Sequence, residues 1–198
     1  LLWSTAFTGI KIGLKYTAPL GFAGVRFMLA GIILIFFVGN LKNYIREIRK
    51  HWKSVLLVGI FQTFIVYSLF YTGMTMISGA LAAIVVGSGP LNAAIVAHLT
   101  MKNDKMNWQK SMSIGIGILG IVIIAISRKP WSLEGIVEFL GIIVLLISSI
   151  SGAYGNVIVS KAKKSVPPMI LASAQLLIGG LALFLVSIPI EGFPDFYS

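Results

Sequence analysis

The side chains with the most chemical potential in this sequence are a few polar groups that lie within long apolar runs. Arg26 follows Pro19, where such a run begins, by seven residues, or about 10 Å along a helix. If the run spans a membrane, a charge at that depth costs about 2.5–3.5 kcal/mol and usually faces a protein interior. We predict that the guanidinium holds an anionic group such as a carboxylate. Pairing with backbone carbonyls, or reaching outward to the headgroups, is the alternative.

Eight other polar or aromatic side chains also fall within the apolar runs. Buried amides need hydrogen-bond partners, so each should face protein or water rather than lipid. Tyr67 and Tyr71 are four residues apart on one helix face and could line a cavity at the level of Arg26; packing or a membrane-interface position is the alternative for Tyr71. For the others, a bound molecule and a neighbouring helix are equally good partners. The residues predicted to bind a small molecule are Trp3, Arg26, Tyr67, Tyr71, Ser88, Asn92, Tyr154, Asn156 and Gln175.

The apolar run from Gly79 to Met101 is interrupted near its middle by Gly87, Ser88, Gly89 and Pro90. Proline removes a backbone donor and crowds the carbonyl four residues earlier, while glycine loosens the same turn. In lipid such a break survives only against protein or a wet cavity. We therefore predict a helix break at Gly87, Gly89 and Pro90, which marks either a binding path or a kinked packing helix.

Catalytic, metal and cofactor chemistry find little support in the sequence. There is no cysteine, and the only histidines, His51 and His98, are far apart in the chain. No pair of carboxylates falls within an apolar run, and no Gly-rich phosphate loop is present. We predict no catalytic residue, no metal and no cofactor, so an intramembrane enzyme is the weaker rival.

These candidate residues must be positioned by membrane helices. The chain has 198 residues, of which 57% are hydrophobic and 11% charged, less than half of the roughly 25% charged residues of soluble domains. We predict an all-α polytopic membrane protein with seven transmembrane helices. Their expected ranges are 1–14, 19–39, 54–77, 79–101, 111–126, 139–160 and 168–190.

The basic residues alternate between the connections of these helices. The links 40–53, 102–110 and 161–167 hold five, three and three Lys or Arg, whereas the other three links hold one, none and two. By the positive-inside rule, links 40–53, 102–110 and 161–167 are cytoplasmic. The net charge of +10 thus reflects topology, and a nucleic-acid partner is not expected.

The chain also contains an internal repeat. A shift of 149 residues places Pro19 on Pro168, Arg26 on Gln175 and Gly31 on Gly180. Five helices per copy means that the second copy enters the membrane inverted, as in secondary transporters. We expect residues 1–128 to form a first repeat and 139–198 the start of a second. The chain would then be a fragment, cut at both ends, of a ten-helix (5+5) inverted-repeat protein.

Several short motifs resemble the EamA-type permeases of the drug/metabolite transporter superfamily. They are residues 2–4, 26–27, 78–84, 87–91, 97–99, 104–108 and 155–157, with Lys11, Gly115, Gly117 and Gly120.

The resemblance implies a ten-helix permease, with no ATP use, that exports or exchanges small metabolites such as amino acids across a bacterial-type plasma membrane. Its partners would be the lipid bilayer and a small-molecule substrate, and a homodimer is left open. A channel or passive membrane receptor is the alternative.

Overall fold

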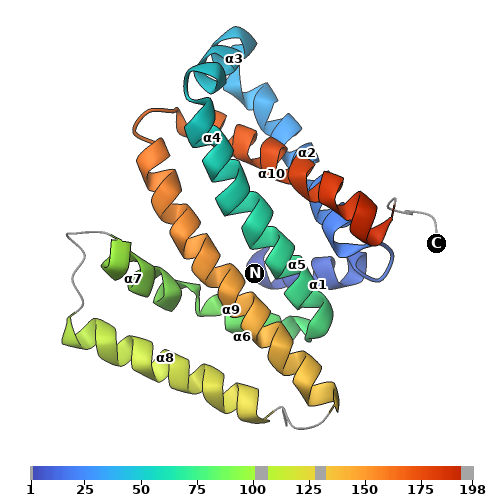
Figure 1. The fold of residues 1–198 in the computed structure, drawn as a ribbon, viewed down its shortest axis with the longest axis vertical. Helices are drawn as coiled ribbons and strands as arrows, with labels where there is room; N and C mark the ends of the chain where they lie inside the picture. The colour runs from blue at the N-terminus through green and yellow to red at the C-terminus, as the bar shows by residue number, and fades with distance from the viewer. Residues whose placement is uncertain (1, 101–106, 128–132, 193–198) are drawn as a thin grey trace. The chain divides into compact units, whose positions relative to one another are not determined.

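A computed structural model describes residues 2–100, 107–127 and 133–192, with side chains described from Phe7 onward except at positions 125, 133 and 134. Every regular element in this described part is a helix. In chain order they are α1 (Leu2–Gly13), α2 (Pro19–Val38), α3 (Leu41–Lys50), α4 (Trp52–Val58), η1 (Gly59–Ile65), α5 (Val66–Met76), α6 (Gly79–Gly87), α7 (Gly89–Thr100), α8 (Trp108–Ser127), α9 (Leu133–Ala162) and α10 (Pro168–Glu191) (Figure 1). The all-α prediction is confirmed.

Five helical stretches in the described residues are long and apolar enough to cross a membrane. They are Pro19–Val38, Trp52–Met76, Gly79–Thr100, Gly135–Ala162 and Pro168–Glu191. The other two predicted spans are shorter, since α1 has 12 residues and the apolar part of α8 covers Trp108–Ile124. Many large apolar side chains of these helices are exposed, as expected of surfaces that face lipid.

Two helical spans differ from the prediction, one in its type of helix and one in the residue at which it begins. The span from Trp52 is not a uniform α-helix, because residues Gly59–Ile65 form a π-helix, η1. Helix α9 begins at Leu133, before the predicted start at Phe139, so part of the expected connection is helical. Nothing from Leu133 to Glu138 stops a helix except the mild effect of Gly135.

The chain divides into two compact units. Unit 1 comprises Leu1–Ile12 and Leu69–Tyr154, and unit 2 comprises Gly13–Ser68 and Gly155–Ser198. The boundaries fall inside α1, α5 and α9.

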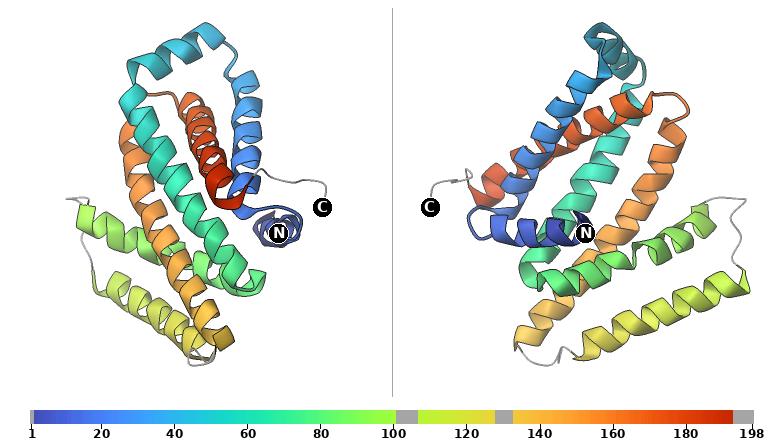
Figure 2. Two further views of the ribbon diagram at one scale, coloured as in Figure 1. Left: turned by 45° about the vertical axis from the view of Figure 1, so that its right-hand side comes forward. Right: turned by 180° about the vertical axis from the view of Figure 1, so that it is seen from behind.

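In unit 2, α10 lies between α2 and the helix formed by α4 and η1 (Figure 2). One core cluster joins Tyr44 of α3 and Val55 of α4 to Ala162, Val166 and residues of α10. The links 40–53 and 161–167 therefore lie at the same end of unit 2.

The opposite ends of α2 and α10 also meet. Both Glu191 carboxylate oxygens accept the Leu20 N–H, at 3.0 and 3.1 Å, and one accepts the Gly21 N–H at 3.0 Å. Helix α2 begins at Pro19 after Ala18, which has no side chain that can cap it. Glu191 at the end of α10 supplies that cap from a distant part of the sequence, so the two helices run antiparallel.

The contact between α2 and α10 is symmetric, because exchanging the two helices by the repeat shift gives equivalent residue contacts. A Cβ at Gly24 would lie 2.9 Å from the Gly180 carbonyl oxygen, and Ser173 Oγ donates to the Gly31 carbonyl oxygen at 2.9 Å. Shifting Gly24 and Gly31 by 149 residues gives Ser173 and Gly180. The second contact is therefore the counterpart of the first.

A second pair of contacts follows the same rule. A Cβ at Gly31 would lie 3.1 Å from the Leu177 nitrogen, and one at Gly180 would lie 2.8 Å from the Met28 nitrogen. The 149-residue shift converts Met28 into Leu177 as well as Gly31 into Gly180.

Candidate functional site

Arg26 and Tyr67 come together in unit 2. Arg26 lies on α2, directly before Phe27, and Tyr67 lies on α5. The Tyr67 ring packs on Phe27, with ring centroids 4.3 Å apart and planes tilted by 51°. This aromatic contact holds Tyr67 against the turn of α2 that carries Arg26. A guanidinium has several fixed N–H donors and a phenol has one, so the pair is suited to a carboxylate or another oxyanion.

A second polar contact in unit 2 joins η1 to α9. Gln62 Nε2 donates to Asn156 Oδ1 at 3.0 Å. Gly155 brings α9 so close that a Cβ there would collide with Gln62 Oε1. This oxygen is buried and has no hydrogen-bond partner among the described residues. Gln62 therefore presents an acceptor that a donor group of a bound molecule, or water, could satisfy.

The geometry of η1 explains how Gln62 reaches α9. Thr63, the next residue, is buried and packs on Gly179 of α10, where a Cβ would collide with it. On the same side, a Cβ at Gly59 would lie 2.9 Å from Ile178. One side of η1 is thus held against α10 by contacts at glycines, while Gln62 contacts α9. Short π-helical segments within α-helices occur frequently at functional sites.

Gln175 of α10 is the other buried amide in this region. A Cβ at Gly59 would lie 3.5 Å from the Gln175 backbone oxygen, so this residue belongs to the surface that α10 presents to η1. Its side-chain Oε1 is buried and, within the described part of the chain, lacks a hydrogen-bond partner. A buried amide oxygen without a donor costs about 1–3 kcal/mol. Gln62 and Gln175 both provide such acceptors.

Two of the predicted residues of unit 1 have hydrogen-bond partners within the protein. Asn92 Nδ2 donates to Ser149 Oγ at 2.9 Å, between α7 and α9. Ser88 Oγ donates to the Val85 carbonyl oxygen at 2.6 Å within its own turn. Helix α6 ends at Gly87 and α7 begins at Gly89, next to Pro90. These bonds favour helix packing over ligand binding for Ser88 and Asn92.

The aromatic candidates of unit 1 behave differently from Tyr67. Tyr71 is fully buried, with an edge-on contact to Phe70 at 5.6 Å between centroids, and Phe70 in turn contacts Phe7. This environment favours the packing alternative for Tyr71. Tyr154 is exposed. The side chain of Trp3 lies outside the described residues.

Gln62 was not among the residues predicted from the sequence. It is the only strongly polar side chain between Lys53 and Ser68 apart from Ser54 and Thr63, which is a detectable signal in an apolar run. Its partner Asn156 is 94 residues away, and neither the pairing nor the π-helix has a local sequence signature.

Comparison of the sequence with known proteins identifies the family of this chain. Residues 1–126 match the EamA-like transporter family. The uncharacterized inner membrane transporter YedA of Escherichia coli strain K12 is 29% identical over 94% of this chain and 58% of its own length. The uncharacterized transporter YoaV of Bacillus subtilis is 22% identical over 98% of this chain and 66% of its own length.

An uncharacterized transporter of Archaeoglobus fulgidus is 25% identical over 92% of this chain and 62% of its own length. The chain thus spans 58–66% of the length of these curated relatives. No solved structure is a significant match. Because the family match covers more than half of the chain, the chain belongs to the EamA-like transporter family, and its five membrane-length apolar helices are those of a multi-pass membrane protein.

Proposed function

We propose that the protein is a secondary transporter that exports or exchanges amino acids or related small organic compounds across the plasma membrane. The observation that carries this proposal is the exchange-symmetric, antiparallel contact of α2 with α10. Two copies of one helix arrangement, inverted relative to each other, are the usual architecture of carriers that alternate access to a central site. We infer that residues 1–128 and 139–198 belong to two such copies.

The shared end of the links 40–53 and 161–167 supports the proposed orientation. Their basic residues favour the cytoplasmic side for both, and one core cluster contains Tyr44 and Val166 from the two links. An odd number of helices per copy requires this arrangement, because equivalent helices α2 and α10 then cross in opposite directions. We place link 102–110 on the same side from its charge.

The proposed substrate contacts are those that unit 2 brings together. Arg26 with Tyr67 would bind an anionic group such as a carboxylate, and the buried Gln175 oxygen would accept a hydrogen bond from an amine or hydroxyl. Arg26 and Gln175 are equivalent under the 149-residue shift.

Counterflow into proteoliposomes tests the proposal. Vesicles that contain the protein and a high concentration of unlabelled amino acids should accumulate external radiolabelled amino acids, with saturable initial rates. Replacement of Arg26 by Ala should lower the rate or raise KM at least several-fold, whereas Arg26→Lys, which keeps the charge, should retain more activity. Gln175→Ala should also impair uptake.

Two results would contradict the proposal. Wild-type rates and unchanged KM in both Arg26→Ala and Gln175→Ala would remove these residues from substrate binding. Uptake that never exceeds the external concentration and does not saturate would point to a channel instead of a carrier.

A further inference from the structure

Helix α3 is anchored to unit 2 by one of its faces. Tyr44 is buried, and its hydroxyl is 3.2 Å from Ser173 Oγ, in hydrogen-bond contact. Ile48, one turn further along, packs on the same core cluster. Asn40 caps the start of α3, with its Oδ1 accepting the Asn43 N–H at 3.1 Å. The orientation of α3 about its own axis is therefore fixed.

A second face of α3 is apolar and exposed. Leu41 and Ile45 are one turn apart and are 57% and 44% exposed. The last turn of α2 precedes them, and its Phe36 and Phe37 are 80% and 70% exposed. Since α2 is of membrane-spanning length, these phenylalanines face lipid. The exposed apolar side chains thus continue from the end of a membrane helix onto α3.

A third face of α3 is basic. At about 100° per residue, Lys42 and Arg49 lie directly beside the stripe of Leu41 and Ile45, on the side away from Tyr44. Beyond them on α3 lie the exposed cations Arg46 and Lys50, and another exposed cation, Lys53, follows on α4. Lys53 Nζ lies 5.8 Å from the Trp52 ring centroid, and that indole is also exposed.

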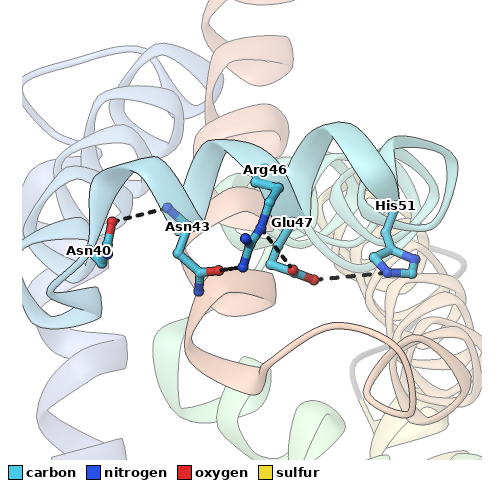
Figure 3. Close-up of polar contacts among 5 residues, drawn as sticks. All are labelled: Asn40, Asn43, Arg46, Glu47 and His51. Atoms are coloured by element: carbon cyan, nitrogen blue, oxygen red, sulfur yellow. Dashed lines mark hydrogen bonds and ion pairs between the residues drawn. The ribbon is translucent and has the colours of Figure 1, made fainter.

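Glu47, the only acidic residue of α3, already interacts with neighbouring residues of the same segment. Arg46 Nη2 donates to Asn43 Oδ1 at 2.6 Å, and Arg46 Nε lies 3.8 Å from Glu47 Oε1. His51 Nε2 lies 3.9 Å from the other Glu47 oxygen. Figure 3 shows this chain of contacts from Asn40 to His51. No second carboxylate in the segment 40–53 can neutralise Lys42 and Arg49.

We propose that α3 is a binding surface for acidic phospholipids of the cytoplasmic leaflet. Leu41 and Ile45 enter the boundary between headgroups and acyl chains, and Lys42, Arg49 and Lys53 bind the phosphates of anionic headgroups. An apolar stripe bordered by basic side chains is the arrangement with which interfacial helices bind such membranes. The continuity with lipid-facing α2 identifies the occupant as membrane lipid, and this binding does not depend on which substrate is transported.

The absence of cysteine from the sequence makes a site-specific test direct. Ile45→Cys, labelled with a fluorophore, is reconstituted in phosphatidylcholine bilayers that contain a small fraction of nitroxide-labelled phosphatidylglycerol or nitroxide-labelled phosphatidylcholine. We expect quenching to be several-fold stronger with the phosphatidylglycerol probe, and this difference to decrease at high salt. Leu41→Cys gives a second, independent reporter on the same stripe.

Two triple variants that remove the same number of positive charges distinguish a local lipid site from an effect of net charge. Combined replacement of Lys42, Arg49 and Lys53 by Gln should remove the preference for phosphatidylglycerol. Combined replacement of Lys161, Lys163 and Lys164, also exposed and at the same end of unit 2, should leave it in place.

Three results would overturn the inference. They are equal quenching by the two lipids, equal loss of preference in the two triple variants, and labels quenched by aqueous iodide but by neither lipid. The last result would indicate that the apolar stripe binds a protein partner and not lipid. Each of these can occur with transport intact, so failure of this inference is distinguishable from failure of the proposed transport function.

Discussion

Among single residues, Gln62 shows most clearly how this fold places polar atoms in an apolar environment. Its amide nitrogen is bonded to Asn156, which fixes the side chain and leaves the oxygen toward Gly155 without a donor. Asn156 and Gln175 were predicted from the sequence as polar groups at membrane depth. Their environments were not predictable, because a single apolar sequence does not specify which helix faces which.

The Gln62–Asn156 hydrogen bond should be measurable as a coupling energy. We expect Gln62→Leu and Asn156→Leu each to lower the free energy of unfolding, and the double variant to lose less than the sum of the two. The difference should be about 0.5–1.5 kcal/mol, the net value of one such hydrogen bond. Thermal unfolding in detergent provides the measurement, and strict additivity would show that the contact contributes nothing.

At the scale of elements, the α2–α10 contact depends on glycine. The backbones approach so closely at Gly24 and Gly180 that neither position has room for a Cβ. Small residues allow such approach between membrane helices. The 149-residue shift connects these two helices in the sequence, yet it does not indicate that they touch. That contact is set by packing and became visible only in the structure.

Gly24→Ala should destabilise the protein. The new Cβ would lie 2.7 Å from the Phe184 nitrogen and 2.9 Å from the Gly180 oxygen, and backbone atoms cannot move aside as side chains do. Overpacking of this kind costs about 1–3 kcal/mol. Gly120→Ala is the matched control, because no atom lies within 4 Å of its Cβ position. Equal midpoints of thermal unfolding for the two variants would refute the close contact.

The cap on α2 gives another prediction for an element. Glu191→Ala removes the acceptor for the Leu20 and Gly21 N–H groups and should cost about 0.5–2 kcal/mol of stability. Glu191→Gln retains one amide oxygen and should lose less. Hydrogen exchange at the first turn of α2 should rise in the order wild type, Gln, Ala. Unchanged exchange in the Ala variant would mean that water replaces the carboxylate at no cost.

At the scale of the whole molecule, membrane character and helix order followed from composition and the spacing of apolar runs. Five of the seven predicted spans have membrane length in the described residues. The break after Gly87 was expected from Pro90, because proline acts locally. The π-helix η1 was not expected. Its Gly59 and Thr63 contact α10, more than 100 residues later, and such distant contacts have no local sequence signature.

The sidedness of the links can be tested with single cysteines. Because the sequence has none, Lys50→Cys and Lys163→Cys each introduce one thiol for a membrane-impermeant maleimide. Both should react only after the cytoplasmic face is opened, whereas Lys15→Cys should react in intact cells. Labelling of positions 50 and 163 from opposite faces would disprove the proposed orientation and the inverted repeat together.

The cap formed by Glu191 also constrains how the protein is made. The residues that need it, Leu20 and Gly21, leave the ribosome about 170 positions before Glu191 does. At about 5–20 residues per second, that interval is roughly 10–30 s. During this time the first N–H groups of α2 must be solvated by water or lipid headgroups inside or beside the translocon. The first turn of α2 therefore reaches its final state only after the nascent chain has delivered α10 to the bilayer.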